Sequence, residues 1–144
     1  MSARSKILLL LQFLCLGYFV LFSRIIASGP LLLIQLLGLA LGVWSVFSMG
    51  LRNFNVQPEV KSGAILIRKG PYALIRNPMY TSLLLFFSAA LTHHFSWKGF
   101  LVLLVLALVF AVKIRDEENF LTLRFGPVYS AYKKSTYRII PYLF

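Results

Sequence analysis

The sequence has few acidic residues, one cysteine and little charge of either sign. Asp and Glu number four in 144 residues, and charged residues make up 13% of the chain, against about a quarter in an average soluble domain. The lone Cys15 excludes an internal disulfide framework and a cysteine-ligated metal cluster, and because it lies within an apolar run we expect it to pack. With 59% hydrophobic residues, the composition excludes an ordinary soluble domain and predicts an all-α integral membrane protein.

Basic residues outnumber acidic ones by fifteen to four, which gives a formal net charge of +11 at pH 7. A nucleic-acid-binding protein would gather this charge on a polar face, whereas here the cations stand between apolar runs. That arrangement is typical of juxtamembrane residues that contact anionic headgroups. We therefore expect the lipid bilayer as a partner and no nucleic acid.

Four apolar runs predict about four transmembrane helices. Residues 7–23 and 31–51 are each close to the roughly 20 residues that a spanning helix needs. Residues 79–92 and 99–112 are shorter, since about 14 residues rise roughly 21 Å, less than a ~30 Å hydrocarbon core. We expect these last two runs to form a short helical hairpin that packs against the longer helices.

The runs divide the chain into one membrane domain with four parts. These are two transmembrane helices (1–52), a cytoplasmic connector (53–78), the helical hairpin (79–112) and a C-terminal cytoplasmic segment (113–144). The first run is expected to be a spanning helix and not a cleaved signal, because a second apolar run follows at once.

The positions of the cations predict the orientation. Thirteen of the fifteen Lys and Arg residues, all except Arg24 and Lys98, fall in the N-terminal segment, between the second and third apolar runs or in the C-terminal segment. Because such residues are enriched in cytoplasmic loops, both termini should be cytoplasmic, at the inner membrane of a bacterium or the endoplasmic reticulum of a eukaryote. His93 and His94 fall in the opposite connection; adjacent residues do not share a helix face, and we expect no metal site there.

The C-terminal segment predicts further helices. The last membrane helix should continue to about Phe125, since Gly126 suits a helix end and Pro127 the first turn of another helix. An apolar stripe with spacings of four, three and four residues is expected to pack against the membrane or the hairpin. Its members are Leu121, Phe125, Val128 and Tyr132.

One polar cluster follows the last membrane run. Three of the four acids are consecutive here: Asp116, Glu117 and Glu118. Acids at the mouth of a helix bundle are costly unless they are paired or used. Arg115 and Glu118 are three residues apart, so they share a helix face and can pair. By itself, the cluster fits a solvated helix as well as a ligand site.

A second polar cluster precedes the hairpin. Gly70 begins a Gly-Pro turn, and Pro78 suits the first turn of a helix. Arg76 and Asn77 would then lie at that helix's N-terminus, where free N–H groups and the helix dipole favour an anion, with Tyr80 just inside. By itself, this pattern is typical of an Asn cap, a cation and an interfacial tyrosine.

Together the two clusters describe one ligand. The second cluster favours a carboxylate and the first supplies carboxylates, while the hairpin would bring them close on the same side of the membrane. A ligand with a carboxylate, an ammonium, hydroxyls and a sulfonium suits such a pocket. S-adenosylmethionine has all of these groups.

Both clusters belong to longer motifs between residues 63 and 141. The motifs are Gly70-Pro71-Tyr72, Arg76-Asn77-Pro78-Met79-Tyr80, Glu117-Glu118-x-x-Leu121-x-x-x-Phe125-Gly126-x-x-Tyr129-x-x-Tyr132 and Arg138-x-x-Pro141. Together they resemble the signature of the isoprenylcysteine carboxyl methyltransferase superfamily and its bacterial relatives. The resemblance implies a helical membrane core that encloses a methyl donor, with lateral entry for a lipophilic acceptor.

Asn77 departs from the isoprenylcysteine enzymes, which typically have His at this place. Asn is common there among phospholipid N-methyltransferases and bacterial relatives, and it cannot carry a proton near neutral pH. The acceptor could thus be a carboxylate, a thiol or a lipid headgroup. An ammonium must first lose its proton, and the absence of an obvious base disfavours it.

The resemblance implies S-adenosylmethionine as cofactor and residues 113–144 as a cofactor-binding segment. The cofactor-binding residues that it implies are Gly70, Tyr72, Arg76, Asn77, Pro78, Tyr80, Glu117 and Glu118. Arg76 and Asn77 would lie near the donor's carboxylate, a glutamate would hold its ammonium or ribose hydroxyls, and Tyr80 would pack on the sulfonium. Arg115 and Arg76 are the expected catalytic residues, with Arg115 orienting the acceptor or steadying the acidic pair.

Two alternatives remain open. The ending, residues 137–144, and Arg115-Asp116-Glu117 also resemble membrane sterol reductases, which bind NADPH but are much longer. The other alternative is a non-catalytic small membrane protein that keeps the fold.

Overall fold

The computed structural model describes residues 2–50 and 65–142, and every described element is helical. The four longer helices are α1 (Ala3–Phe22), α2 (Pro30–Met49), α3 (Pro78–His93) and α4 (Trp97–Phe125). A 3-10 helix, η1 (Gly70–Ala73), precedes α3, and a short helix, α5 (Pro127–Lys134), follows α4. The predicted all-α membrane fold is confirmed.

Proline, glycine and serine set the helix boundaries. Proline opens α2, α3 and α5, where its missing N–H has no intrahelical partner to lose. The Ser96 hydroxyl caps α4 by accepting from the Gly99 N–H at 3.0 Å. Gly126 has a φ of +51°, which favours glycine, and separates α4 from α5 as the sequence predicted.

Three of the described helices, α1, α2 and α4, are long and apolar enough to cross a membrane. α3 has 16 residues and is below that length, and three residues, 94–96, separate it from α4. α4 has 29 residues and rises about 43 Å, which exceeds a ~30 Å hydrocarbon core. Its C-terminal part therefore extends past the hydrocarbon and carries the acidic cluster.

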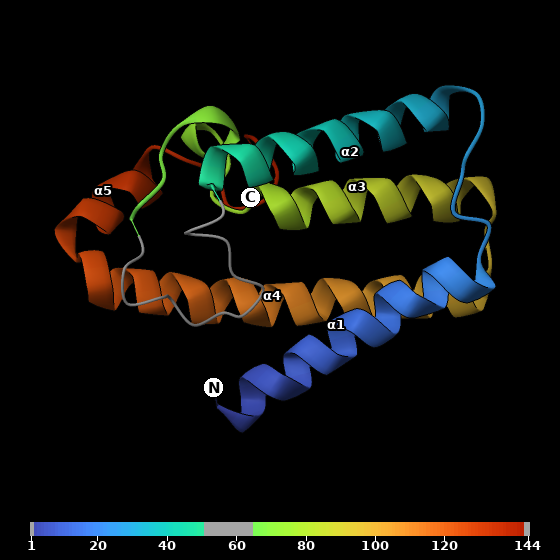
Figure 1. The fold of residues 1–144 in the computed structure, drawn as a ribbon, viewed down its shortest axis with the longest axis horizontal. Helices are drawn as coiled ribbons and strands as arrows, with labels where there is room; N and C mark the ends of the chain where they lie inside the picture. The colour runs from blue at the N-terminus through green and yellow to red at the C-terminus, as the bar shows by residue number, and fades with distance from the viewer. Residues whose placement is uncertain (1, 51–64, 143–144) are drawn as a thin grey trace.

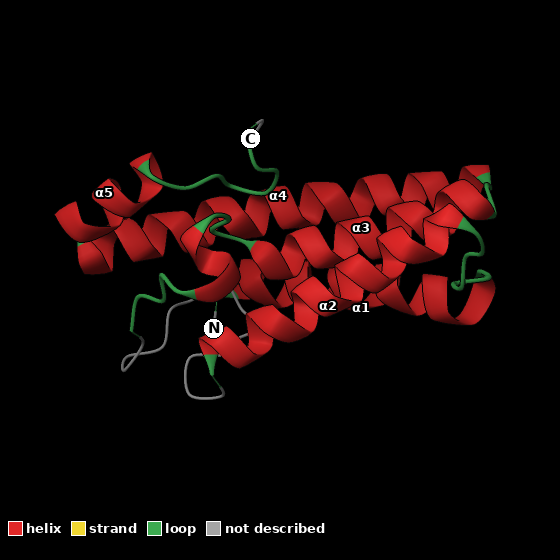
Figure 2. Cartoon of the chain, turned by 90° about the horizontal axis from the view of Figure 1, so that it is seen from above, coloured by secondary structure: helices red, strands yellow, loops and turns green. Residues whose placement is uncertain are grey.

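The helices pack as two layers. α2 packs along α3, α1 crosses α4 obliquely, and α3 also contacts α4 (Figure 1). Cys15 and Phe19 of α1 join Phe87 of α3 with Leu106 and Phe110 of α4 in a buried cluster, where Cys15 has the packing role expected of it. The chain ends and α5 lie at one end of the bundle, opposite the short α1–α2 and α3–α4 connections (Figures 1 and 2).

Small residues allow α2 to approach α3 closely. A Cβ atom on Gly42 would lie 2.8 Å from the Ser82 hydroxyl oxygen, and one on Gly38 would lie 3.0 Å from the Ser82 carbonyl oxygen. Both distances are shorter than ordinary van der Waals contact. Side chains at these glycines would therefore separate the two helices.

The predicted apolar stripe runs across the break between α4 and α5. Val128 is half exposed, whereas Tyr129 and Tyr132 are buried. The stripe assumed a continuous helical period, but the left-handed backbone at Gly126 ends α4 and α5 begins a new register. Within the protein, Tyr129 and Tyr132 are thus the buried aromatic residues of α5, and the packing of Val128 on the membrane stays a prediction.

Candidate active site

A C-terminal strap, residues 135–142, brings the two sequence motifs together. It pairs with the segment before α3 through an isolated bridge between Ile75 and Tyr137. The Arg76 N–H donates to the Tyr137 carbonyl at 2.8 Å, and the Tyr137 N–H donates to the Leu74 carbonyl at 2.9 Å. The strap thus holds the start of α3 against the C-terminal part of α4.

Asn77 bonds to the strap and does not cap α3. It is the N-cap residue, but its side-chain amide donates to the Arg138 carbonyl at 2.9 Å. The Thr81 hydroxyl similarly donates to the Ile139 carbonyl at 2.9 Å. The first turn of α3 is therefore tied to the strap by side chains that donate to main-chain carbonyls.

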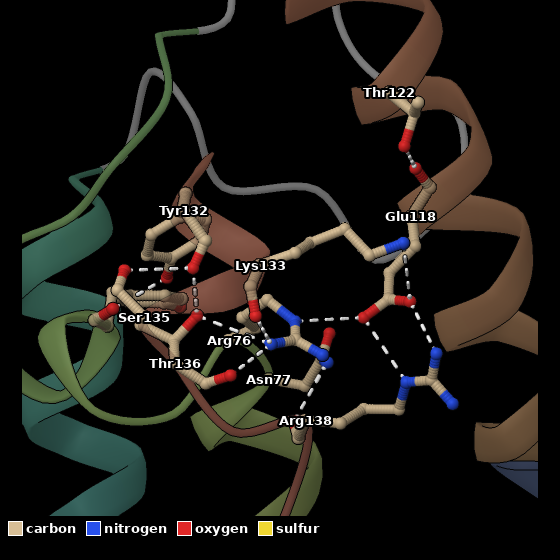
Figure 3. A network of polar contacts seen from close by, with 10 residues as sticks. Arg76, Asn77, Glu118, Thr122, Tyr132, Lys133, Ser135, Thr136 and Arg138 are labelled. Atoms are coloured by element: carbon tan, nitrogen blue, oxygen red, sulfur yellow. Dashed lines mark hydrogen bonds and ion pairs between the residues drawn. The ribbon is translucent and has the colours of Figure 1, made fainter. Parts of the chain in front are cut away.

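Glu118 lies at the centre of a buried ion cluster (Figure 3). Its side chain is 5% exposed and accepts from Arg76 at 3.0 Å and from Arg138 at 2.8 Å, with Lys133 Nζ at 3.7 Å. Arg76 also donates to the Lys133 carbonyl at 3.0 Å and to the Thr136 carbonyl. Three cations thus surround one carboxylate and lock α4, α5, the strap and the start of α3 together.

This cluster corrects the expected Arg115–Glu118 pair. Arg115 is exposed on α4, and the cations that bind Glu118 come from the start of α3, α5 and the strap. Helical spacing alone allows an i,i+3 pair, but such exposed pairs contribute little. Glu118 therefore binds the three nearby cations and not Arg115.

A cavity of about 560 Å³ lies beside this cluster, within the range of small-molecule sites. Its wall is mostly apolar and is formed mainly by α2 and α3, with one or two residues each from α1, η1, the segment before α3 and α4. The apolar part includes Leu39, Val43 and Phe47, of which Phe47 is 79% exposed. Because exposed residues of a spanning helix belong to its wall, the cavity reaches the surface that α2 presents to lipid.

The polar part of the wall contains Glu117, Tyr80, Lys113 and Gln12. The Tyr80 hydroxyl donates to a Glu117 carboxylate oxygen at 2.5 Å. Lys113 lies one turn before Glu117 on α4, and its Nζ donates to the side-chain amide oxygen of Gln12 (Oε1) at 2.6 Å. A carboxylate and an ammonium therefore share one face of α4 at this part of the cavity.

Tyr72 of η1 contributes a buried hydroxyl to the same wall. Its oxygen has no hydrogen-bond partner among the described residues. Burial and the negative charge of Glu117 raise the pKa of Tyr72 well above its usual value, so the hydroxyl stays a donor. The neighbouring Tyr132 is different, because its hydroxyl donates to the Tyr72 carbonyl at 2.6 Å and burial raises its pKa to about 12.

The structure brings most of the predicted cofactor-binding residues together. Those that line the cavity are Tyr72, Arg76, Asn77, Pro78, Tyr80 and Glu117. Gly70, Glu118 and Arg115 lie outside its wall. Gly70, at a φ of +60°, instead packs closely on Ser48 and Trp44 of α2.

Two polar residues of the wall, Gln12 and Lys113, were missed in the sequence. Each is buried, at 6% and 1% exposure. The signal that could have found them is that polar or charged residues inside a membrane helix are expensive and mark functional positions. Gln12 interrupts an apolar run, and Lys113 follows one directly.

A family model described as "Phospholipid methyltransferase" matches residues 24–128. The match covers α2, η1, α3 and α4 and ends at the start of α5, leaving α1 outside. No curated protein matches the chain.

Proposed function

Because the chain belongs to the phospholipid methyltransferase family, we propose that it transfers a methyl group from S-adenosylmethionine to a lipophilic acceptor inside the cavity. The observation that carries the proposal is the cavity itself. The carboxylate of Glu117 and the buried hydroxyl of Tyr72, which has no partner in the described part of the chain, lie in its polar part, while its apolar part reaches the surface of α2. Such a site suits a polar donor and an apolar acceptor together.

The residues present fit the donor. Glu117 would hold its ammonium or ribose hydroxyls, and the buried Tyr72 hydroxyl, which bonds to none of the described residues, would donate to an oxygen or nitrogen of the donor. Arg76 and Asn77 would face its carboxylate from the cavity wall. The electron-rich ring of Tyr80, already held by its bond to Glu117, suits a sulfonium.

Bound S-adenosylmethionine would supply an electrophilic methyl group on its sulfonium. A lone pair of the acceptor would form the new bond to this methyl, and the electron pair of the broken C–S bond would stay on sulfur. The protein's task is then positioning and exclusion of water. The Glu118 cluster fixes Arg76 and the strap, so the donor side of the cavity is preorganised. Leu39, Val43 and Phe47 would admit the acceptor's apolar chain from the bilayer.

We further propose that both termini are cytoplasmic. The α1–α2 connection, which contains Arg24, and the start of α4, which contains Lys98, lie at the opposite end of the bundle from α5 (Figure 1). The cation-rich end therefore carries the polar part of the cavity, and the cation bias favours this end as the cytoplasmic one.

Calorimetric titration of the detergent-purified protein with S-adenosylmethionine, its demethylated product and NADPH tests the proposal. We expect the first two to bind and NADPH not to bind. Binding of NADPH alone would assign the chain to the reductase-like alternative, and binding of none of the three would favour the non-catalytic one.

A matched pair of variants locates the donor. Glu117→Gln should weaken donor binding roughly 10- to 100-fold, because a hydrogen bond to a charged group contributes about 1.5–3 kcal/mol. Asp116→Asn is the control, since Asp116 pairs with the exposed Arg4 at 3.1 Å outside the cavity wall. If both variants bound the donor with equal affinity, the donor would not contact Glu117.

A further inference from the structure

The part of the bundle that extends past the hydrocarbon exposes apolar side chains. Leu123, near the end of α4, is 84% exposed, and Phe120, which shares its helix face, is also exposed. On α5, Tyr129 and Tyr132 are buried, whereas the outer face carries the half-exposed Val128. Exposed apolar residues that gather at one place mark contact with a protein or a membrane.

The charges at this end are not balanced within the described residues. All three acids among these residues are engaged inside the protein, through the ion pair of Asp116, the hydrogen bond of Glu117 and the cluster of Glu118. Three exposed cations form no ion pair with any described residue: Arg68 and Lys69, which precede η1, and Lys134, which ends α5. This part of the surface therefore carries a positive charge that suits an anionic partner.

Contact between α5 and η1 gathers these residues at one end of the bundle. The Tyr132 hydroxyl of α5 donates to the Tyr72 carbonyl of η1 at 2.6 Å, and α5 also contacts α4. The end of α4, α5 and the segment before η1 accordingly lie at the same end (Figures 1 and 2). We call the exposed apolar and cationic residues here the α5 surface, which consists of Leu123, Val128, Lys134, Arg68 and Lys69.

The rise of α4 sets the depth of the α5 surface. With Trp97 at one face of the hydrocarbon, Glu117 lies about 30 Å away, at the other face. Leu123 lies about 9 Å further along the helix, and an ordinary tilt of about 20° shortens this rise along the membrane normal. Because a headgroup layer is about 5–8 Å thick, the α5 surface lies beside the headgroups and not far out in water.

We propose that the α5 surface binds the headgroups of anionic phospholipids. Cationic side chains interleaved with apolar ones suit a lipid interface, where the cations attract anionic headgroups and the apolar groups leave water. A second copy of the chain would bring the same positive charge and be repelled, and a nucleic acid would leave the apolar side chains uncovered. Because α5 also holds the Tyr72 carbonyl through Tyr132, lipid bound to α5 would steady the polar wall of the cavity.

A fluorescent label on the outer face of α5 tests the proposal. Ala131→Cys in a Cys15→Ala background gives one exposed cysteine, and the labelled protein is placed in nanodiscs that contain a lipid with a headgroup-attached spin label as quencher. We expect phosphatidylglycerol, at about one third of the lipid, to raise the quenching at least about twofold over phosphatidylcholine alone. Salt at about 1 M should reverse the increase, because the Debye length falls to about 3 Å. Equal quenching in both kinds of disc, or none in either, overturns the proposal.

Two matched variants of the labelled protein assign the effect to the cations. Arg68→Gln/Lys69→Gln/Lys134→Gln should abolish the increase in quenching, because it removes the charges that attract the lipid. Arg24→Gln/Lys98→Gln, at the opposite end of the bundle, should keep the increase. An increase that survives in the triple variant, or that is lost equally in the double variant, overturns the assignment.

Native mass spectrometry gives a measurement that leaves the buried Cys15 in place. From nanodiscs with equal amounts of the two lipids, the wild-type protein should retain phosphatidylglycerol about fivefold over phosphatidylcholine, since a cation near the surface contributes about that factor. The triple variant should lose most of this preference, and an unchanged preference overturns the proposal. Neither measurement uses a methyl donor, so neither outcome depends on the proposed function.

Discussion

Glu117 and Glu118 are neighbours on α4, yet they belong to two different regions of the molecule. Glu118 is enclosed by Arg76, Lys133 and Arg138, whereas Glu117 faces the cavity and accepts from the Tyr80 hydroxyl. Successive residues of a helix point about 100° apart, so one helix can serve two sites at the same level. The comparison teaches that an acid with several cations around it holds the fold, while an acid that faces a cavity can serve a ligand.

The largest effect should come from removing the enclosed acid. Glu118→Leu leaves the buried Arg76 guanidinium without its carboxylate, and breaking such a pair costs about 3–5 kcal/mol. We expect this loss in the free energy of unfolding, measured by SDS titration in mixed micelles. Asp116→Asn, at an exposed pair on the same helix, should change it by less than about 1 kcal/mol. A similar loss in the free energy of unfolding in both variants would show that Glu118 is not more important for the fold than an exposed acid.

Removing the Tyr72 hydroxyl should affect binding more than folding. Tyr72→Phe deletes a buried hydroxyl that has no hydrogen-bond partner among the described residues, so the free energy of unfolding should stay the same or rise. Donor affinity should fall roughly three- to tenfold, as a neutral hydrogen bond contributes about 0.5–1.5 kcal/mol. Tyr132→Phe is the matched comparison: its hydroxyl is already bonded to the Tyr72 carbonyl, so this variant should lose stability. Calorimetry measures the donor affinity and SDS titration the stability of each variant. Loss of stability in Tyr72→Phe, or loss of donor affinity in Tyr132→Phe alone, would contradict the prediction.

Glu117→Gln should hardly change the stability, in contrast to Glu118→Leu. The amide carbonyl can still accept from Tyr80, and the cost of burying a charge is removed. We expect the free energy of unfolding in SDS to change by no more than about 1 kcal/mol. A loss as large as that of Glu118→Leu would show that Glu117 also holds the fold.

The smallest effect is expected at Arg115. Its side chain is exposed and lies outside both the ion cluster and the cavity wall. Arg115→Ala should change the free energy of unfolding by no more than about 0.5 kcal/mol and leave donor affinity unchanged in calorimetry. Loss of methyl transfer with unchanged donor binding would restore the catalytic role first predicted for Arg115.

Local chemistry made much of the fold predictable. The apolar runs, the prolines that open helices and Gly126 set the helices and the break after Phe125. The burial of Tyr129 did not follow from the helical period, because a single left-handed residue starts a new register. The placement of the connector, residues 53–78, can be compared only from residue 65 onward, since 51–64 lie outside the described residues.

The candidate site was predictable only in part. Tyr72, Asn77, Tyr80 and Glu117 were expected together from their motifs, and they do share one cavity. Its functional assignment remains a prediction. Gln12 could not be placed beside Lys113 from spacing, because their contact joins residues 101 positions apart. The partners of Glu118 were missed for the same reason, since three separate segments converge on it.

The length of α4 has a consequence for membrane asymmetry. From Trp97 to Glu117 the helix rises about 30 Å, close to the full hydrocarbon thickness. With the start of α4 at one face of the hydrocarbon, Glu117 would reach the headgroup layer of the other face, and under the proposed function an acceptor that enters past α2 would come from that leaflet. Methylated product would be deposited in the same monolayer, and its appearance in the other one would depend on a separate flipping step.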